Sequence, residues 1–376
     1  MQRRKKILML PLDERPCNYL YPKMLFEGNP DYELLMPPRE KLGVKKRAAR
    51  FEDIRAFLLE NAKGADIAVL SIDMLLYGGL LPGRIHTHKK EELLGRLELL
   101  KEIKRANPAL KIYAFHLIMR CPQYSSSEEE PDYYGSCGRE IYLYGEAVCK
   151  QRLGLPDGGN ADRYRAVVGP YLSDYLVRRK VNAEMNCAVV DLIGACIDFL
   201  VIPQDDSSVY GFVAEDQQAV RDHIAKREKQ EKVLIYPGAD EVGMTLLARA
   251  VNEDRGDVPR ISVFYSSVKA PFIVPKYEDR MLGESVKLQI AAAGCRSNRA
   301  FCEDDILLAV NAPAGRMREA DEQFRLRPDG DYSVGRSVLL FAQEVADLAS
   351  RGKTVAAADV AYGNGSDAGL VTLLDR

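Results

Sequence analysis

The feature that most constrains the fold is a regular alternation, along the whole chain, of short apolar runs and amphipathic charged stretches. The apolar runs are rich in Val, Ile and Leu and lack strict polar alternation, which is typical of strands buried on both faces of a parallel sheet. The stretches between them carry apolar residues at helical spacing. We predict strands at about 7–12, 67–72, 111–118, 198–204, 232–237, 261–266, 306–311 and 354–360, and helices at 45–61, 89–106, 215–232, 242–252, 284–293 and 337–351.

About eight strand–helix units favour an α/β fold of the (β/α)8 TIM-type barrel, with residues 1–376 forming a single domain. An open doubly wound sheet is the alternative. The glycine-rich fingerprint of dinucleotide-binding sheets is absent after the first strand, where residues 11–16 read Pro-Leu-Asp-Glu-Arg-Pro. Residues 121–181 break the alternation between the third and fourth strands. We expect them to form a helical or loop insertion or lid, in which the Ser/Glu run at 125–130 is interpreted as solvated loop.

Composition narrows the possible partners and compartments. With a net charge of −2 and a sequence pI of about 6.2, the chain has no excess of positive charge for binding nucleic acid or an anionic membrane. The basic start at 3–6 is followed by an apolar run too short for a signal peptide, and no segment reaches the roughly 18 apolar residues of a membrane span. We therefore expect a cytoplasmic protein that binds neither nucleic acid nor membrane. The eight cysteines show no zinc-binding spacing, so no zinc site is expected. The leading hypothesis developed below includes no metal and no cofactor.

The strongest chemical signal is the pair Asp205-Asp206, which follows the apolar run 199–203. Adjacent carboxyl groups can divide their roles, because one stays ionised while its like-charged neighbour has a raised pKa and can act as a general acid. Glycoside hydrolysis needs such a pair. A helix N-cap would explain one of the two aspartates, but it explains two less well.

Other predicted strands also end in polar residues. Asp240 and Glu241 follow the fifth strand, where they are either accessory carboxylates or the cap and first turn of the helix at 242–252. His116 and Arg120 lie four apart near the third strand, and we interpret this histidine as a core residue rather than a catalyst. The remaining strand-end candidates are Asp13, Glu14, Arg15, Asp73, Asn311, Asp359 and Asn364, and Asp367 is interpreted as a cap of the last helix.

Six blocks of the sequence resemble the bacterial family catalogued as domain of unknown function 4127 (DUF4127). They lie at 10–18, 71–84, 204–211, 236–243, 310–313 and 359–367, and they span almost the entire chain. Arg84, Gln204 and Tyr236 lie within these blocks and complete the set of candidates. The family typically continues with a Gly-Trp-Asn-Thr-like segment, so the resemblance implies that this chain lacks a C-terminal part. It implies no established activity.

The leading hypothesis is a glycoside hydrolase-like enzyme whose candidate substrates include N-acetylhexosaminides. Asp206 is the predicted general acid, Asp205 orients the substrate or stabilises positive charge, and Asp240 or Glu241 is the accessory carboxylate. Two alternatives remain open: a Mg²⁺- or Ca²⁺-dependent hydrolase or lyase with an acidic metal site, and a non-catalytic protein that binds a sugar or metabolite. The expected partner is a small-molecule or carbohydrate substrate, and the sequence does not specify an oligomeric state. The predicted substrate-binding residues are Asp13, Glu14, Arg15, Asp73, Arg84, Gln204, Tyr236, Asn311, Asp359 and Asn364.

Overall fold

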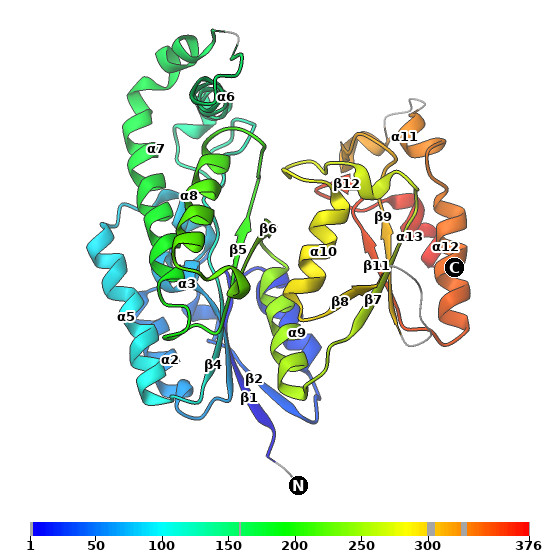
Figure 1. The fold of residues 1–376 in the computed structure, drawn as a ribbon, viewed down its shortest axis with the longest axis horizontal. Helices are drawn as coiled ribbons and strands as arrows, with labels where there is room; N and C mark the ends of the chain where they lie inside the picture. The colour runs from blue at the N-terminus through cyan, green and yellow to red at the C-terminus, as the bar shows by residue number, and fades with distance from the viewer. Residues whose placement is uncertain (1–2, 158, 299–304, 325–328, 376) are drawn as a thin grey trace. The chain divides into compact units, whose positions relative to one another are not determined.

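A computed structural model describes residues 3–157, 159–298, 305–324 and 329–375. The chain divides into two compact units, Met1–Ala250 and Val251–Arg376, where the sequence had predicted one domain. The boundary falls inside helix α9 (Val242–Arg255), so no linker composition marks it in the sequence. Each unit has its own parallel sheet (Figure 1).

The first unit is built on a six-stranded sheet in which every neighbouring pair is parallel. Its strand order is β2-β1-β3-β4-β5-β6. The chain therefore places β2 on one side of β1 and then reverses, adding β3 and all later strands on the other side. The strands are β1 (Lys5–Leu10), β2 (Tyr32–Leu35), β3 (Ile67–Ser71), β4 (Lys111–Phe115), β5 (Phe199–Gln204) and β6 (Val233–Pro237).

Helices cover both faces of this sheet, as the apolar composition of its strands requires. Leu8 and Leu70 belong to a core cluster that also contains buried residues of α2 (Phe51–Ala62), α5 (Lys90–Ala106), α7 (Ala161–Val190) and α8 (Phe212–Lys226). The neighbouring residue Met9 faces the other way, where its methyl group lies against Gly243 of α9. The shorter helices of the unit are α1 (Pro16–Phe26), α3 (Ile72–Tyr77) and α4 (Leu80–Ile85).

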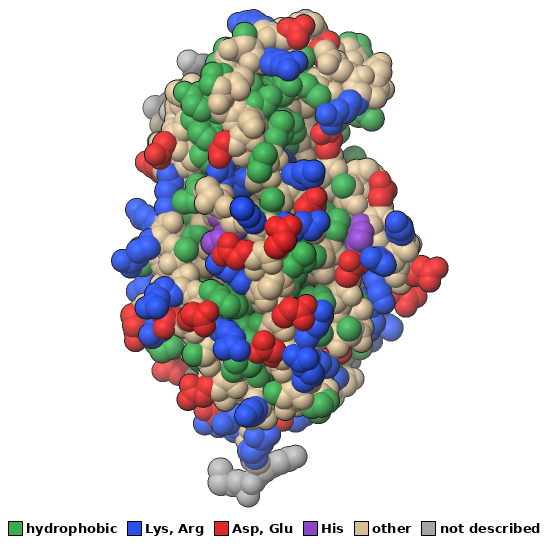
Figure 2. All heavy atoms as spheres, turned by 90° about the vertical axis from the view of Figure 1, so that its left-hand side faces the viewer, with side chains coloured by type: hydrophobic (Ala, Val, Ile, Leu, Met, Phe, Trp, Pro, Cys, Tyr) green, Lys and Arg blue, Asp and Glu red, His purple; other side chains and the backbone are tan. Residues whose placement is uncertain are grey.

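The segment expected as an insertion is largely helical. It contains α6 (Tyr134–Arg152) and the long helix α7, both of which lie between β4 and β5 in the chain. Figure 2 shows the side of the molecule that includes this segment, with charged side chains of both signs interspersed over it. Several large hydrophobic side chains are exposed on α7 or just after α6, namely Leu153, Leu155, Val167, Tyr171, Leu176 and Val177.

The second unit repeats the same kind of architecture on a smaller scale. Its main sheet has four described strands, which are all parallel and follow the order β11-β9-β7-β8, and β10 and β12 form a separate pair. Val310 of β9 packs with α10 (Leu282–Ala292), whereas the adjacent Ala309 packs with α12 (Val338–Ser350) and α13 (Ala368–Leu374), so helices cover both faces. The remaining elements are β7 (Arg260–Tyr265), β8 (Arg296–Asn298), β9 (Ile306–Asn311), β10 (Arg318–Glu319), α11 (Gly330–Ser333), β11 (Val355–Asp359) and β12 (Tyr362–Gly363).

The α/β class and the parallel sheets are confirmed, but the closed barrel is not. All eight predicted strands have a counterpart in the structure. The described strands form open sheets. In each sheet the second strand, β2 or β8, lies on one side of the first strand, and the later strands are added on the other side, unlike the continuous strand order of a barrel. Both strands are short, and their sequences, Tyr-Glu-Leu-Leu and Arg-Ser-Asn, contain no long apolar run. No helix in the described part of the chain is long and apolar enough to cross a membrane.

Candidate functional site

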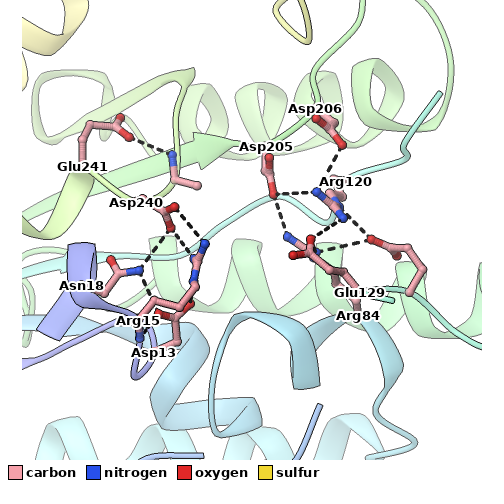
Figure 3. Close-up of polar contacts among 12 residues, drawn as sticks. Asp13, Arg15, Asn18, Arg84, Arg120, Glu129, Asp205, Asp206, Asp240 and Glu241 are labelled. Atoms are coloured by element: carbon pink, nitrogen blue, oxygen red, sulfur yellow. Dashed lines mark hydrogen bonds and ion pairs between the residues drawn. The ribbon is translucent and has the colours of Figure 1, made fainter. Parts of the chain in front are cut away.

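Polar residues gather at the carboxyl edge of the six-stranded sheet. Because all strands of this sheet are parallel, the segments that follow β1, β3, β4, β5 and β6 emerge at one edge. These segments carry most of the residues predicted from the sequence. Figure 3 shows how the central residues lie.

The Asp205–Asp206 pair lies against two buried arginines. Arg84, from α4, donates a hydrogen bond of 2.7 Å to Oδ2 of Asp205. Arg120, from the segment after β4, lies 3.3 Å from Oδ2 of Asp206 and 3.7 Å from Oδ2 of Asp205. The side chains of both arginines are less than a tenth exposed, at 5% and 8%. Ion pairs this far from water are much less screened than surface pairs, so they fix the position of the two carboxyl groups.

Two glutamates complete this cluster, and Figure 3 labels the first of them, Glu129. Glu130 is buried and accepts a hydrogen bond of 2.7 Å from Nε of Arg120. Glu129 accepts hydrogen bonds from Arg84 at 3.0 Å and from Arg120 at 2.8 Å. Both glutamates belong to the Ser/Glu run that the sequence suggested was solvated loop. That interpretation is wrong for the buried Glu130, whereas the side chain of Glu129 is 47% exposed.

Asp206 is the most perturbed member of the pair. Burial raises the pKa of its carboxyl group to about 7, the charge of Asp205 adds to the rise, and Arg120 opposes it. Its backbone φ of 44° lies in the left-handed region, which is uncommon for a residue other than glycine. Such strained positions are concentrated at functional sites. Asp206 can therefore hold a proton near neutral pH while it lies beside Asp205.

Glu241 is a second carboxylic acid with a raised pKa. Its Oε2 accepts a hydrogen bond of 3.1 Å from the backbone N–H of Ala239, whereas its buried Oε1 has no hydrogen-bond partner among the described residues. Burial raises its pKa to about 7, and the charges of Asp240 and Asp205 contribute to the rise. Gly238 makes this arrangement possible, since a Cβ at that position would collide with the Glu241 carboxyl group.

A third group of side chains joins the segments that follow β1 and β6. Arg15 donates to Oδ2 of Asp13 at 2.8 Å and to Oδ2 of Asp240 at 3.0 Å. Asn18, from the first turns of α1, donates to the same two carboxylates at 2.9 and 3.1 Å. Asp240 is therefore a partner of Arg15 rather than simply a helix cap.

Asp73 and His116 form a fully buried pair beneath this edge. Oδ2 of Asp73 accepts a hydrogen bond of 3.0 Å from the backbone N–H of Leu117, and its Oδ1 lies 4.0 Å from Nε2 of His116. Burial raises the pKa of Asp73 to about 7 and lowers the pKa of His116 to about 3, so the histidine is neutral. A cavity of about 20 Å³, large enough for one water, is lined by Asp73, Arg84 and Arg120 among others.

A larger cavity of about 400 Å³ opens where the chain reverses between β1 and β3. In open α/β sheets this reversal point, at the carboxyl edge, is the usual place for a ligand. Glu14 contributes to its wall and also accepts a hydrogen bond of 2.9 Å from the backbone N–H of Lys45. The cavity is lined by Asp13, Glu14, Arg15, Gly43, Lys45, residues 78–81, Glu128 and Glu129.

Two predicted substrate-binding residues of this unit are fully buried. Gln204 accepts a hydrogen bond from the side chain of Gln217, in α8. Tyr236 is enclosed, and its hydroxyl has no hydrogen-bond partner among the described residues. Burial raises the pKa of Tyr236 well above its ordinary value, and the charge of Glu241 adds to the rise. The two groups are therefore neighbours.

Three other predicted residues belong to the second unit. Asn311 donates a hydrogen bond of 3.0 Å to Asp359 and accepts one of 2.7 Å from the buried Arg336. Arg336 in turn pairs with Asp367 at 2.6 Å, and Asp367 caps α13 as expected. Asn364 lies apart from this network and donates to Glu319 at 3.2 Å. The predicted residues are thus divided between two carboxyl edges.

Among the described residues, no group of three or more His, Cys, Asp or Glu is arranged to hold a metal ion.

Comparisons with known proteins give a family and no activity. A profile of the family described as "Protein of unknown function (DUF4127)" matches residues 7–376. No curated protein matches the chain. Among solved structures, the chain is similar to yeast methylglyoxal/isovaleraldehyde reductase Gre2 complexed with NADPH, with 10% identity, coverage of 66% of this chain and 75% of that chain, and a TM-score of 0.24. It is also similar to the GH1 β-glucosidase of Exiguobacterium antarcticum B7, with 7% identity, coverage of 86% and 72%, and a TM-score of 0.22. Both scores are too low for either likeness to carry an argument.

Proposed function

Given that this chain belongs to the DUF4127 family of unknown function, we propose that it is a glycoside hydrolase-like enzyme that works by acid–base chemistry on carboxyl groups. One observation carries the proposal. Asp205 is held in ion pairs with two buried arginines, while the adjacent Asp206 has a pKa raised to about 7. Neighbouring carboxyl groups in such different environments are the usual basis for dividing acid and base roles.

Asp206 is the proposed general acid. Its protonated carboxyl group would donate a proton to the glycosidic oxygen as the bond from that oxygen to the anomeric carbon breaks. Asp205, held in its ion pairs with Arg84 and Arg120, would stabilise the positive charge that develops on the sugar ring. Glu241, whose pKa is also raised to about 7, is the proposed accessory carboxylate that accepts a proton from the attacking water.

The cavity at the reversal between β1 and β3 is the proposed place for the rest of the substrate. Its polar lining includes Asp13, Arg15 and Glu129, which can exchange hydrogen bonds with sugar hydroxyl groups. A volume of about 400 Å³ falls within the range of small-molecule sites. The proposal does not require a closed barrel, since an open parallel sheet also presents its strand ends at one edge.

Turnover of a panel of aryl glycosides, including N-acetylhexosaminides, tests the proposal. We expect at least one substrate to be hydrolysed, and Asp206→Asn to lower kcat/KM by about 10² or more. Asp222→Asn is a matched control, because this exposed aspartate of α8 bonds only to Gln218 among the described residues. Full activity of Asp206→Asn would contradict the assigned role.

The same assay separates the two alternative functions. Turnover that is lost with a chelator and restored by Mg²⁺ or Ca²⁺ would favour a metal-dependent hydrolase or lyase. Saturable binding of an oligosaccharide, with no turnover of any substrate and no effect of Asp206→Asn, would favour a non-catalytic binding protein.

A further inference from the structure

The two sheets share one strand order, and this points to a second ligand site. In the first unit the second strand lies on one side of the first strand, and the third lies on the other side. The second unit repeats the pattern, with β8 on one side of β7 and β9 on the other. Each sheet therefore has a reversal point at its carboxyl edge, which is where open α/β sheets bind ligands.

The second unit has a cavity at its own reversal point. The cavity measures about 440 Å³, close to the volume of the cavity between β1 and β3. Its walls come from the segment after β7, which supplies Lys276, and the segment after β9, which supplies Arg316–Arg318. The other lining residues are Glu322, Asp329 and Asp331.

Most of the charged groups in this cavity are already satisfied. Arg318 pairs with Asp329 at 2.6 Å, and Lys276 pairs with Glu319. The carboxylate of Asp331 accepts a hydrogen bond of 3.0 Å from the backbone N–H of Arg316. The guanidinium group of Arg316 and the carboxylate of Glu322 are different, because neither side chain forms an ion pair or hydrogen bond with any residue in the described part of the chain.

Contacts between the two segments hold the walls in place. Met317 is buried, and its sulfur accepts a hydrogen bond of 3.4 Å from the backbone N–H of Lys276. On the other side, the Tyr332 hydroxyl accepts a hydrogen bond of 2.9 Å from the backbone N–H of Arg318 and donates one of 2.8 Å to the carbonyl of Ala361. Met317 and the backbone of Arg318 are thus held in position, so this part of the cavity wall is formed before any ligand arrives.

We propose that this cavity is a second binding site, specific for a small molecule that carries an anionic oxygen group, either a carboxylate or a phosphate. Arg316 supplies the contact, since a guanidinium group binds either anion through two parallel hydrogen bonds. The flanking pairs Arg318–Asp329 and Lys276–Glu319 are already neutral, and the carboxylates of Glu322 and Asp331 add negative charge to the wall, so a ligand with one anionic group is favoured over a polyanion. This site is independent of the hydrolase proposed for the first unit.

Calorimetric titration of the full chain with inorganic phosphate and, separately, with acetate tests the proposal. We expect one of the two probes to bind saturably, and Arg316→Gln to weaken that binding at least tenfold. Arg351→Gln is the matched control, because this exposed arginine lies in the same unit and pairs only with Asp347 among the described residues. Asp206→Asn should also leave the binding unchanged, which separates this site from the first one.

The two probes distinguish a phosphate ligand from a carboxylate ligand. Equal binding of the wild-type protein and Arg316→Gln would overturn the proposal, as would the absence of saturable binding of both probes at millimolar concentration. Because Arg316 is exposed, its replacement should not disturb folding, and an unchanged thermal midpoint of Arg316→Gln would verify this.

Discussion

At the scale of single residues, the candidate site combines buried arginines with carboxylic acids that hold protons near neutral pH. Asp73, Asp206 and Glu241 each have a pKa raised to about 7, mainly through burial. Arg84 and Arg120 compensate part of the negative charge. Small changes in pH near neutrality should therefore change the protonation of several groups at once, and the macroscopic pKa values will belong to the cluster as a whole.

The pH dependence of activity follows from the roles of Asp206 and Glu241. Because Asp206 must be protonated and Glu241 ionised, kcat/KM should be highest near pH 7, falling at higher pH as Asp206 loses its proton and at lower pH as Glu241 gains one. The measurement is a pH–rate profile on whichever glycoside is hydrolysed, with Asp222→Asn as the control. A profile that stays flat from pH 6 to pH 9 would rule out Asp206 as the acid.

Glu241→Gln should change the stability of the protein in a pH-dependent way. The folded-state pKa of about 7 lies above the ordinary value of 4.5, so between these values the folded protein binds more protons than the unfolded chain. The contribution of Glu241 to stability therefore falls as the pH rises. The free energy of unfolding of Glu241→Gln, relative to that of the wild type, should therefore increase by on the order of 1–3 kcal/mol from pH 5 to pH 8.

Urea unfolding at the two pH values measures this difference. Glu60→Gln, at an exposed position of α2, is the control and should show no such trend. An equal effect of Glu241→Gln at both pH values would show that the carboxyl group is not buried in a proton-holding form.

Sequence patterns identified the residues next to strand ends but not their distant partners. Asp205, Asp206, Asp240 and Glu241 stand out because each pair directly follows an apolar run. Glu129 and Glu130 do not, because their importance comes from contacts with Arg84, 45 and 46 residues away in the chain. No local pattern encodes a contact of this kind.

At the scale of elements, the segment between β4 and α6 is held in place by charge. Glu130 lies in this segment, is buried, and pairs with Arg120 and Arg84. Replacing it with alanine would leave both arginines short of a buried partner. We expect Glu130→Ala to destabilise the first unit by about 2–4 kcal/mol and to make residues 121–133 more susceptible to protease.

Glu128→Ala provides the matched control for this change. Glu128 lies two residues away, is exposed, and forms no ion pair with any described residue, so its replacement should alter stability by less than about 0.5 kcal/mol. Urea unfolding combined with limited proteolysis measures both effects. Equal susceptibility of the two variants would show that the buried ion pairs do not anchor the segment.

Two short strands explain why a barrel was predicted and open sheets were found. Strands rich in Val, Ile and Leu were all identified, because burial on both faces requires an apolar run. β2 and β8 lie at sheet edges, where half-exposed or exposed positions allow polar residues such as Glu33 and Ser297. Without these two strands, the sequence pattern indicates eight successive strand–helix units. The order of the strands within a sheet cannot be deduced from that alternation alone.

At the scale of the whole molecule, each unit has a hydrophobic core of its own. The core around Leu8 and Leu70 is made of residues of the first unit, whereas the cores around Val286 and Phe341 are made of residues of the second. Compact units with separate cores can unfold locally at different free energies. The division therefore predicts that a core substitution in one unit lowers the local stability of that unit and has little effect on the other.

Hydrogen exchange on paired core variants tests this division. Phe341 is 3% exposed and packs against Phe264 at a ring-centroid distance of 5.8 Å, so Phe341→Ala should cost about 3–5 kcal/mol. We expect faster exchange in β7, β9, β11 and α12, with β1–β6 unchanged. Leu70→Ala, at a fully buried position of β3, should produce the reverse pattern. If Phe341→Ala instead accelerated exchange equally in both sheets, the two units would unfold as one cooperative body, and the independence of the two proposed sites would have to be argued from their ligands alone.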